Sequence, residues 1–183
     1  MIWDDENLIK VLEGNGVVVM PTDTLYGIVG KALSEITVER IYKLRKRNLE
    51  KPCIILIGDI NELKKFDIVL TKAQRNEIGK YREPTSFIVD CADEKFSYLH
   101  RGTCTLAFRL PASKSLRNFL IKTGPLVAPS ANPEGLSPAH TVFEAQEYFG
   151  DQVDLYIDGG EIRGKASKIV KLHKNGSASI IRQ

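Results

Sequence analysis

The hydrophobic positions of this chain follow two spacings that alternate along its length. Leu8, Ile9 and Leu12 recur at helical spacing and predict a helix over about 5–12, which a glycine-rich turn then ends. The continuous apolar run 17–20 follows, and such a run is typical of a buried strand. Because helix-like segments and short β-branched runs alternate throughout, the pattern indicates an α/β fold.

A second helix is expected from Ser34 to about Arg45. Ser34 is a suitable N-cap, Glu35 lies in the first turn and Lys43 in the last, which suits the helix dipole. Further helices are predicted over 72–80, 113–122 and 139–149.

Short apolar and β-branched runs predict the remaining strands. They lie at 53–57, 86–89, 105–110, 126–128, 155–157, 168–172 and 178–181. In the last third, strands follow one another without intervening helices, so we expect a sheet that is partly antiparallel. The length of 183 residues suits a single domain over 1–183.

Composition narrows the class of protein. Apolar residues make up 43% and charged residues 27%, and no apolar run approaches the roughly 20 residues that cross a bilayer. The acidic start of the chain does not resemble a secretory signal, so we expect a cytoplasmic protein with no membrane contact. The dispersed cysteines argue against a disulfide or a zinc site, and Cys53 and Cys104 are expected to be buried in strands.

Positive charge is concentrated between the second helix and the following strand. The segment 43–51 carries Lys43, Arg45, Lys46, Arg47 and Lys51 against Glu50. Guanidinium groups hold phosphate oxygens through paired donors, so this cluster suits a polyphosphate. A solvated helix end that complements the dipole is the alternative.

Two polar loops follow predicted strands. The loop 21–27 is rich in hydroxyls, and 129–132 opens a strand into small polar residues. Each is typical of a ligand site, the second of a phosphate site. Local chemistry alone favours a plain turn for the first loop, and the second is equally compatible with a proline-rich helix cap.

The segment 159–165 has the glycine and lysine spacing of a P-loop. However, Ala166 stands where a P-loop needs a hydroxyl, and a strand rather than a helix is predicted next. The three histidines lack metal-site spacing, and no nucleophile elbow is present, so a protein nucleophile is not indicated.

Taken in order, these motifs resemble the YrdC-type threonylcarbamoyl-AMP synthase family. The resemblance rests on 21–27, 45–47 with 51–52, 84–86, 105–109 with 111, 129–132, and 158–160 leading to 167. It implies a twisted sheet of parallel and antiparallel strands, helices around it, and a basic concave cavity. It also implies the substrates ATP, L-threonine and bicarbonate, with Mg²⁺ accompanying the ATP.

The resemblance assigns roles to particular residues. The expected threonine contacts are Thr24, Arg109, the Ala128 backbone and Ser167. The expected ATP contacts are Arg45, Arg47, Lys51, Thr105, Ser130, Ser137 and Arg182. Arg47, Lys51, Ser130 and Asn132 are expected to take part in catalysis by positioning and charge neutralisation, and Arg109 is expected to grip the threonine carboxylate.

Several positions depart from the family pattern. Arg45 stands where Lys is usual, Leu56 where some members have His, and Lys168 where Thr is common. The loop between Asn132 and Ser137 is one residue shorter than in many relatives, and the 84–86 motif lacks a preceding Trp-Pro-Gly. These departures concern threonine specificity more than the fold.

Two alternative functions remain open at the level of sequence. One is a paralogue that binds double-stranded RNA or tRNA through a basic concavity without activating threonine, with affinity that falls steeply with salt. The other is an O-carbamoyl transfer domain, which normally accompanies further domains. If the chain is a synthase, its unstable product implies transient contact with a downstream threonylcarbamoyl transferase.

Overall fold

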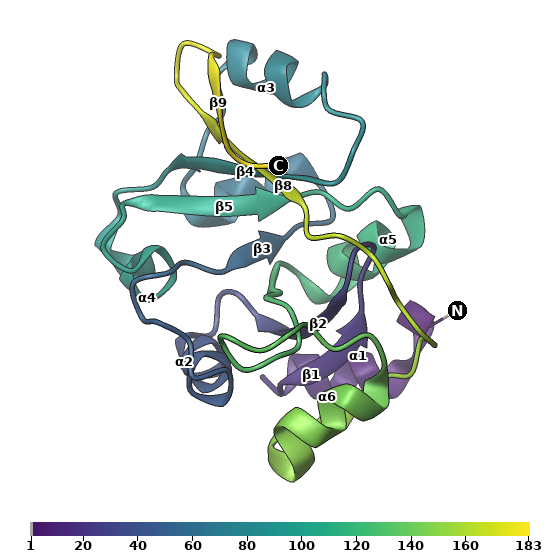
Figure 1. Ribbon diagram of the computed structural model, residues 1–183. Coiled ribbons are helices and arrows are strands. Elements are labelled where there is room, and N and C mark those ends of the chain that lie inside the picture. The colour runs from purple at the N-terminus through teal and green to yellow at the C-terminus, as the bar shows by residue number, and fades with distance from the viewer. Residues whose placement is uncertain (1) are drawn as a thin grey trace.

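The computed structural model describes residues 2–183, which form one mixed sheet covered by helices on both faces (Figure 1). The strands are β1 Val18–Pro21, β2 Tyr26–Lys31, β3 Ile54–Leu56, β4 Thr85–Asp90, β5 Thr105–Arg109, β6 Leu126–Val127, β7 Leu155–Tyr156, β8 Lys168–Leu172 and β9 Ala178–Arg182. Their order across the sheet is β7-β1-β2-β6-β3-β5-β4-β8-β9. The pairs β1–β7, β3–β5 and β4–β8 are parallel and the others antiparallel, which confirms the expected mixed sheet.

α-Helices and short 3₁₀ helices lie before and between these strands in the chain. The α-helices are α1 Glu6–Glu13, α2 Glu35–Leu44, α3 Lys72–Ile78, α4 Ser97–His100, α5 Lys114–Thr123 and α6 Val142–Phe149. Short 3₁₀ helices span Ile2–Asp4, Ile60–Phe66, Glu94–Phe96 and Gly150–Gln152.

The apolar side chains form two cores because strand residues alternate between the two faces of the sheet. Val18 and Met20 of β1 pack with α1 and α5, whereas Val17 and Val19 belong to the core that includes α2 and α6. A run that is apolar at every position is therefore buried on both sides, as the pattern of β1 predicted.

Every predicted strand position is confirmed. The structure adds one strand, β2, which the apolar pattern did not predict. Gly27 and Gly30 interrupt that pattern, and glycine weakens a strand signal. Gly30 is required by close packing, because a Cβ there would lie 2.3 Å from the Thr37 methyl carbon. The helix expected from 139 begins later, at Val142, with Thr141 as its N-cap.

Two local expectations were wrong. Ser34 precedes α2 as expected, but its hydroxyl bonds to Thr37 Oγ1 at 2.9 Å instead of capping the helix. Cys104 is exposed rather than buried, because it precedes β5 in a turn with φ of 52°. Cys53 is buried, as expected, and both thiols are free.

The P-loop-like segment 159–165 has no regular structure and leads into β8, so no helix N-terminus is presented there. Its exclusion as a phosphate loop is confirmed. Within residues 2–183, no helix combines the length and the apolar character needed to cross a bilayer.

Candidate functional site

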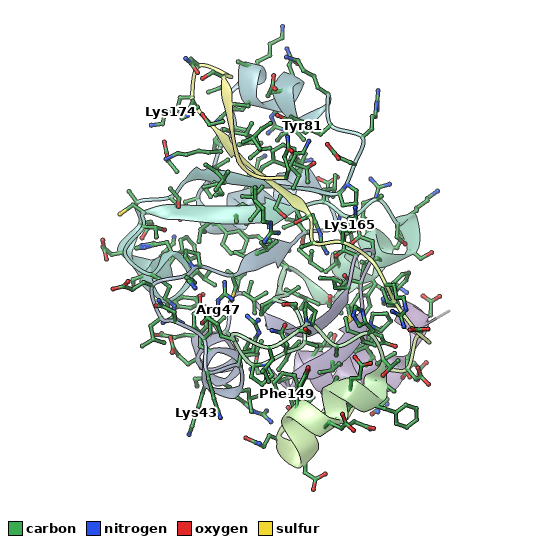
Figure 2. All side chains as sticks on the ribbon, in the orientation of Figure 1. Lys43, Arg47, Tyr81, Phe149, Lys165 and Lys174 are labelled. Atoms are coloured by element: carbon green, nitrogen blue, oxygen red, sulfur yellow. The ribbon has the colours of Figure 1, made fainter. Side chains whose placement is uncertain are left out.

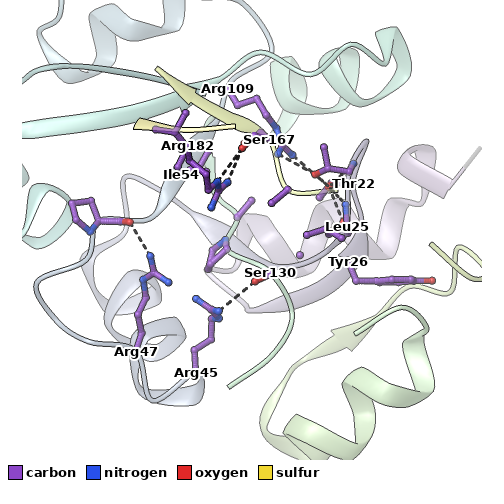
Figure 3. A pocket seen from close by; sticks show the side chains of 17 residues that line it. Thr22, Leu25, Tyr26, Arg45, Arg47, Ile54, Arg109, Ser130, Ser167 and Arg182 are labelled. Atoms are coloured by element: carbon purple, nitrogen blue, oxygen red, sulfur yellow. Dashed lines mark hydrogen bonds between the residues drawn. The ribbon is translucent and has the colours of Figure 1, made fainter. Parts of the chain in front are cut away.

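A cavity of about 170 Å³ lies where β2, β5, β8 and β9 meet the end of α2 (Figure 3). Its wall includes four arginines from three parts of the chain, which are Arg45 and Arg47, Arg109, and Arg182. The polar side chains fall into two groups. One group consists of Thr22, Thr24, Arg109 and Ser167, and we call this region the Arg109 end of the cavity. The other consists of Arg45, Arg47 and Ser130, and we call it the Arg45 end.

Arg109, the last residue of β5, is fixed by the loop between β1 and β2. Its Nη1 donates to Thr24 Oγ1 at 3.0 Å, and its Nη2 donates to Asp23 Oδ1 at 3.0 Å and to Thr22 Oγ1 at 3.4 Å. Burial lowers the pKa of Arg109, and the charge of Asp23 opposes that shift. Its Nε is buried and has no hydrogen-bond partner among the described residues.

Ser167 closes the same end from the segment that precedes β8. Its hydroxyl lies 2.8 Å from that of Ser86, which is fully buried on β4. Arg182 of β9 donates to the Ser167 carbonyl from Nη2 at 2.7 Å. The last strand therefore holds the wall of the cavity in place.

The segment 158–167 crosses directly over the β1–β2 loop. The Tyr26 hydroxyl donates to the Gly160 carbonyl at 2.8 Å and accepts from the Gly159 amide at 2.8 Å. At Gly164 a Cβ would lie 1.8 Å from the Thr24 carbonyl oxygen, so only glycine permits this crossing. The P-loop-like glycines thus serve close backbone packing.

At the other end, Arg45 is 3% exposed although it carries a charge. Its Nε donates to the Asn132 carbonyl at 2.8 Å, and its Nη2 lies 3.4 Å from Ser130 Oγ. Burial and the neighbouring Arg47 lower the pKa of Arg45 to about 10. Its Nη1 is buried without a partner among residues 2–183, which leaves a donor for an anion.

The remaining basic groups lie on the rim of the Arg45 end. Arg47 donates to the Lys51 carbonyl and to the Pro52 carbonyl, each at 3.0 Å. Lys51 Nζ pairs with Glu134 Oε1 at 2.6 Å, and the Asn48 amide also donates to Glu134. These contacts, led by that of Lys51, lower the pKa of Glu134 to about 2.

The structure brings most of the predicted site residues together. The cavity is lined by Thr24, Arg45, Arg47, Arg109, Ala128, Ser130, Ser167 and Arg182. Thr24 and Arg109 were both expected on the threonine side, and they are in direct contact.

Four predicted residues do not line this cavity. Lys51 lies on the rim, and Asn132 is buried behind Arg45, where its amide donates to the Leu136 carbonyl at 2.8 Å. Thr105 is at the opposite end of β5 from Arg109, and Ser137 is exposed in the loop before α6. Their proposed roles stay predictions.

Two family departures fall outside the cavity wall. Leu56 is fully buried in the core with Leu116 and Phe119 of α5 and is not among the residues that line the cavity, although it pairs with Arg109 between β3 and β5. Lys168 pairs with Glu83 and also lies outside the lining.

The sequence alone did not assign roles to Asp23, Thr22, Tyr26 or Ser86. All four lie within the motifs 21–27 and 84–86. The motifs therefore located the region of the site but did not predict which contacts each side chain makes. Within residues 2–183, no group of three His, Cys, Asp or Glu side chains is arranged to hold a metal ion.

Four arginines line a small cavity of this α/β domain and two of them are buried, an arrangement suited to an anionic ligand. A family model for Sua5, YciO and YrdC proteins, described as telomere recombination, matches residues 10–183. The chain belongs to this family.

Relatives agree with this assignment. The threonylcarbamoyl-AMP synthase of Hahella chejuensis is 28% identical over 99% of this chain and 98% of its own length. That of Enterobacter sp. strain 638 is 30% identical over 86% of this chain and 84% of its own. A crystal structure of Pyrococcus abyssi Sua5 complexed with L-threonine has the same fold, with a TM-score of 0.84 and 24% identity. It is matched over 100% of this chain, which spans 54% of that longer protein.

Proposed function

We propose that this chain is an L-threonylcarbamoyladenylate synthase, a nucleotidyltransferase that converts L-threonine, bicarbonate and ATP into threonylcarbamoyl-AMP and pyrophosphate. The relatives named as synthases over most of the chain support this function. The product would serve the formation of threonylcarbamoyladenosine in tRNA.

The observation that carries the proposal is the division of one cavity into two ends. The Arg109 end combines a guanidinium with the hydroxyls of Thr24 and Ser167, which suits a small amino acid with one carboxylate. The Arg45 end offers Arg45, Arg47 and Ser130, which suit a polyphosphate. Pyrococcus abyssi Sua5 has been obtained as a complex with L-threonine, which supports threonine as a substrate.

The proposed chemistry balances without a protein nucleophile. The neutral threonine amine adds to carbon dioxide and releases a proton to give a carbamate, or it condenses with bicarbonate to give the carbamate and water. A carbamate oxygen then attacks the α-phosphorus of ATP, the bond to the β-phosphate oxygen breaks, and pyrophosphate leaves. Arg45 and Arg47 would neutralise charge that grows on the phosphates, and the two ends would hold the reactants in line.

Mg²⁺ is proposed as part of the substrate, because ATP enters such reactions as its magnesium complex. The described side chains offer no cluster of carboxylates for it. We therefore assign no protein ligand to Mg²⁺ and expect the phosphates to carry it.

Pyrophosphate release tests the function. The purified protein is incubated with MgATP, L-threonine and bicarbonate, and each component is then omitted in turn. Release that needs all three is expected, and Arg47→Ala should abolish it. Lys43→Ala is the matched control, since Lys43 is exposed on α2 and projects outward, whereas Arg47 lies toward the interior (Figure 2).

The same experiment separates the alternative functions. A protein that only binds double-stranded RNA or tRNA would release no pyrophosphate, and its affinity would fall with salt. An O-carbamoyl transfer domain would not require threonine. Direct tRNA contact, transient contact with a threonylcarbamoyl transferase and a cytoplasmic location are the remaining proposals, and pull-down and fractionation would test them.

A further inference from the structure

The Arg109 end contains a carboxylate that the proposed reaction does not use. Asp23 Oδ1 lies 3.0 Å from Arg109 Nη2, and the side chains are 7% and 6% exposed, respectively. Asp23 Oδ2 also accepts from the Ala112 amide at 3.2 Å. Asp23 is absent from the cavity lining, so a ligand in that cavity meets Arg109 and not Asp23.

This pair changes what the Arg109 end offers to an anion. The guanidinium charge is largely neutralised by Asp23, while its Nε remains buried with no partner among the described residues. A singly charged carboxylate fits such a site, because it can accept the remaining Nε donor and needs little further positive charge. A multiply charged phosphate is better matched by a guanidinium without a carboxylate partner, and within residues 2–183 Arg45 is such a group because its guanidinium bonds to Asn132 and Ser130.

We propose that Asp23 is a positioning and anion-selectivity residue, which orients Arg109 and keeps phosphate out of the amino-acid end of the cavity. This inference rests on the proposed function. Its physical cause is that both ends contain arginine, so charge balance rather than residue type distinguishes them. Asp23 at one end and the unpaired Nη1 of Arg45 at the other then determine which substrate binds where.

The test compares Asp23→Asn with Asp154→Asn. Asp154 is a matched control because it also bonds an arginine, Arg40, and a backbone amide, that of Val17, outside the cavity. Steady-state kinetics of pyrophosphate release are measured for each variant with threonine and ATP varied separately. Inorganic phosphate is then added as the probe anion, and thermal unfolding of each variant is recorded.

For Asp23→Asn we expect a KM for threonine raised by roughly tenfold or more, with the KM for ATP unchanged, because Asn keeps an acceptor but removes the charge that strengthens the bond to Arg109. Phosphate should become a competitive inhibitor against threonine in this variant but not in the wild type or Asp154→Asn. An unchanged KM for threonine would overturn the proposal. A raised KM without phosphate competition would overturn the selectivity role.

The wild-type protein distinguishes a failure of this proposal from a failure of the proposed function. If the wild type releases no pyrophosphate, the function itself is wrong. If Asp23→Asn is too unstable to assay, Asp23→Asn is introduced into Arg109→Ala, where removing an unpaired buried carboxylate should raise the melting temperature. A fall in melting temperature there would show that Asp23 acts independently of Arg109 and would overturn the proposal.

Discussion

The two ends of the cavity use the same side chain, arginine, in opposite electrostatic states. At the Arg109 end the guanidinium is paired with a buried carboxylate and tied to two threonine hydroxyls. At the Arg45 end the buried guanidinium bonds to neutral groups, and its nearest carboxylate, Glu134, lies on the rim with Lys51. A count of basic residues would not distinguish the two buried arginines, whereas their partners do, because Arg109 is paired with a carboxylate and Arg45 bonds neutral groups.

This difference has an energetic meaning. A buried pair is strongly disturbed when one member is lost, but an exposed pair contributes little. Changes at the Arg109 end should therefore affect both stability and activity. Changes at the rim of the Arg45 end should alter nucleotide affinity with little effect on folding.

Arg109→Ala should have the largest effect on the protein. It leaves Asp23 buried and unpaired, so we expect a loss of about 3–5 kcal/mol in the free energy of unfolding. Threonine-dependent pyrophosphate release should fall by at least about 30-fold. Chemical denaturation and the release assay measure the two effects. A variant with wild-type stability would contradict the description of the Arg109 end as a buried ion pair.

Leu56→His should have the next largest effect, and on stability rather than on substrate. The new ring would be placed among fully buried apolar side chains, at a cost of about 2–3 kcal/mol. Leu56→Met, which nearly conserves volume, is the control and should cost less than about 1.5 kcal/mol. Thermal unfolding and the KM for threonine are the measurements. A lower KM without a loss of stability would mean that position 56 does face the cavity.

Glu134→Gln should have the smallest effect, and it should strengthen substrate binding where the two preceding substitutions cause a loss. The neutral side chain would release Lys51 and the Asn48 amide, so ATP should bind more tightly by roughly two- to fivefold. Titration calorimetry with ATP measures the change, and Glu50→Gln, at an exposed carboxylate in the loop between α2 and β3 that carries Lys51, is the control. Weaker binding than in the wild type would identify Glu134 as a support of the nucleotide site and not a competitor of the phosphates.

The same contact predicts a pH dependence. The pKa of Glu134 is lowered to about 2, so its carboxylate is fully ionised at neutral pH. A carboxyl group whose pKa is lowered by folding stabilises the protein at pH values above its ordinary pKa. That stabilisation is lost as the pH falls toward the lowered pKa. The Lys51–Glu134 contact should therefore persist at pH 5 and weaken progressively toward pH 2, which carboxyl chemical shifts can follow.

Local patterns predicted much of the fold, since apolar runs such as 17–20 and 168–172 depend on nearby residues alone. They failed at β2 and Cys104, where Gly27, Gly30 and a left-handed turn respond to packing across the chain. Within the site, the family motifs located Thr24 and Arg109. The pairing of Arg109 with Asp23 is a contact between distant segments, and no local period encodes it.

The order in which the strands are connected affects how the cavity forms during folding. The cavity needs residues from Thr22 in the β1–β2 loop to Arg182 in β9, and β1 and β4 pair with strands far along the chain. Such non-local pairing slows folding, because long loops must close before their contacts contribute. The binding site is therefore complete only when these distant segments have met, and a bound substrate would stabilise the completed chain over partly folded ones.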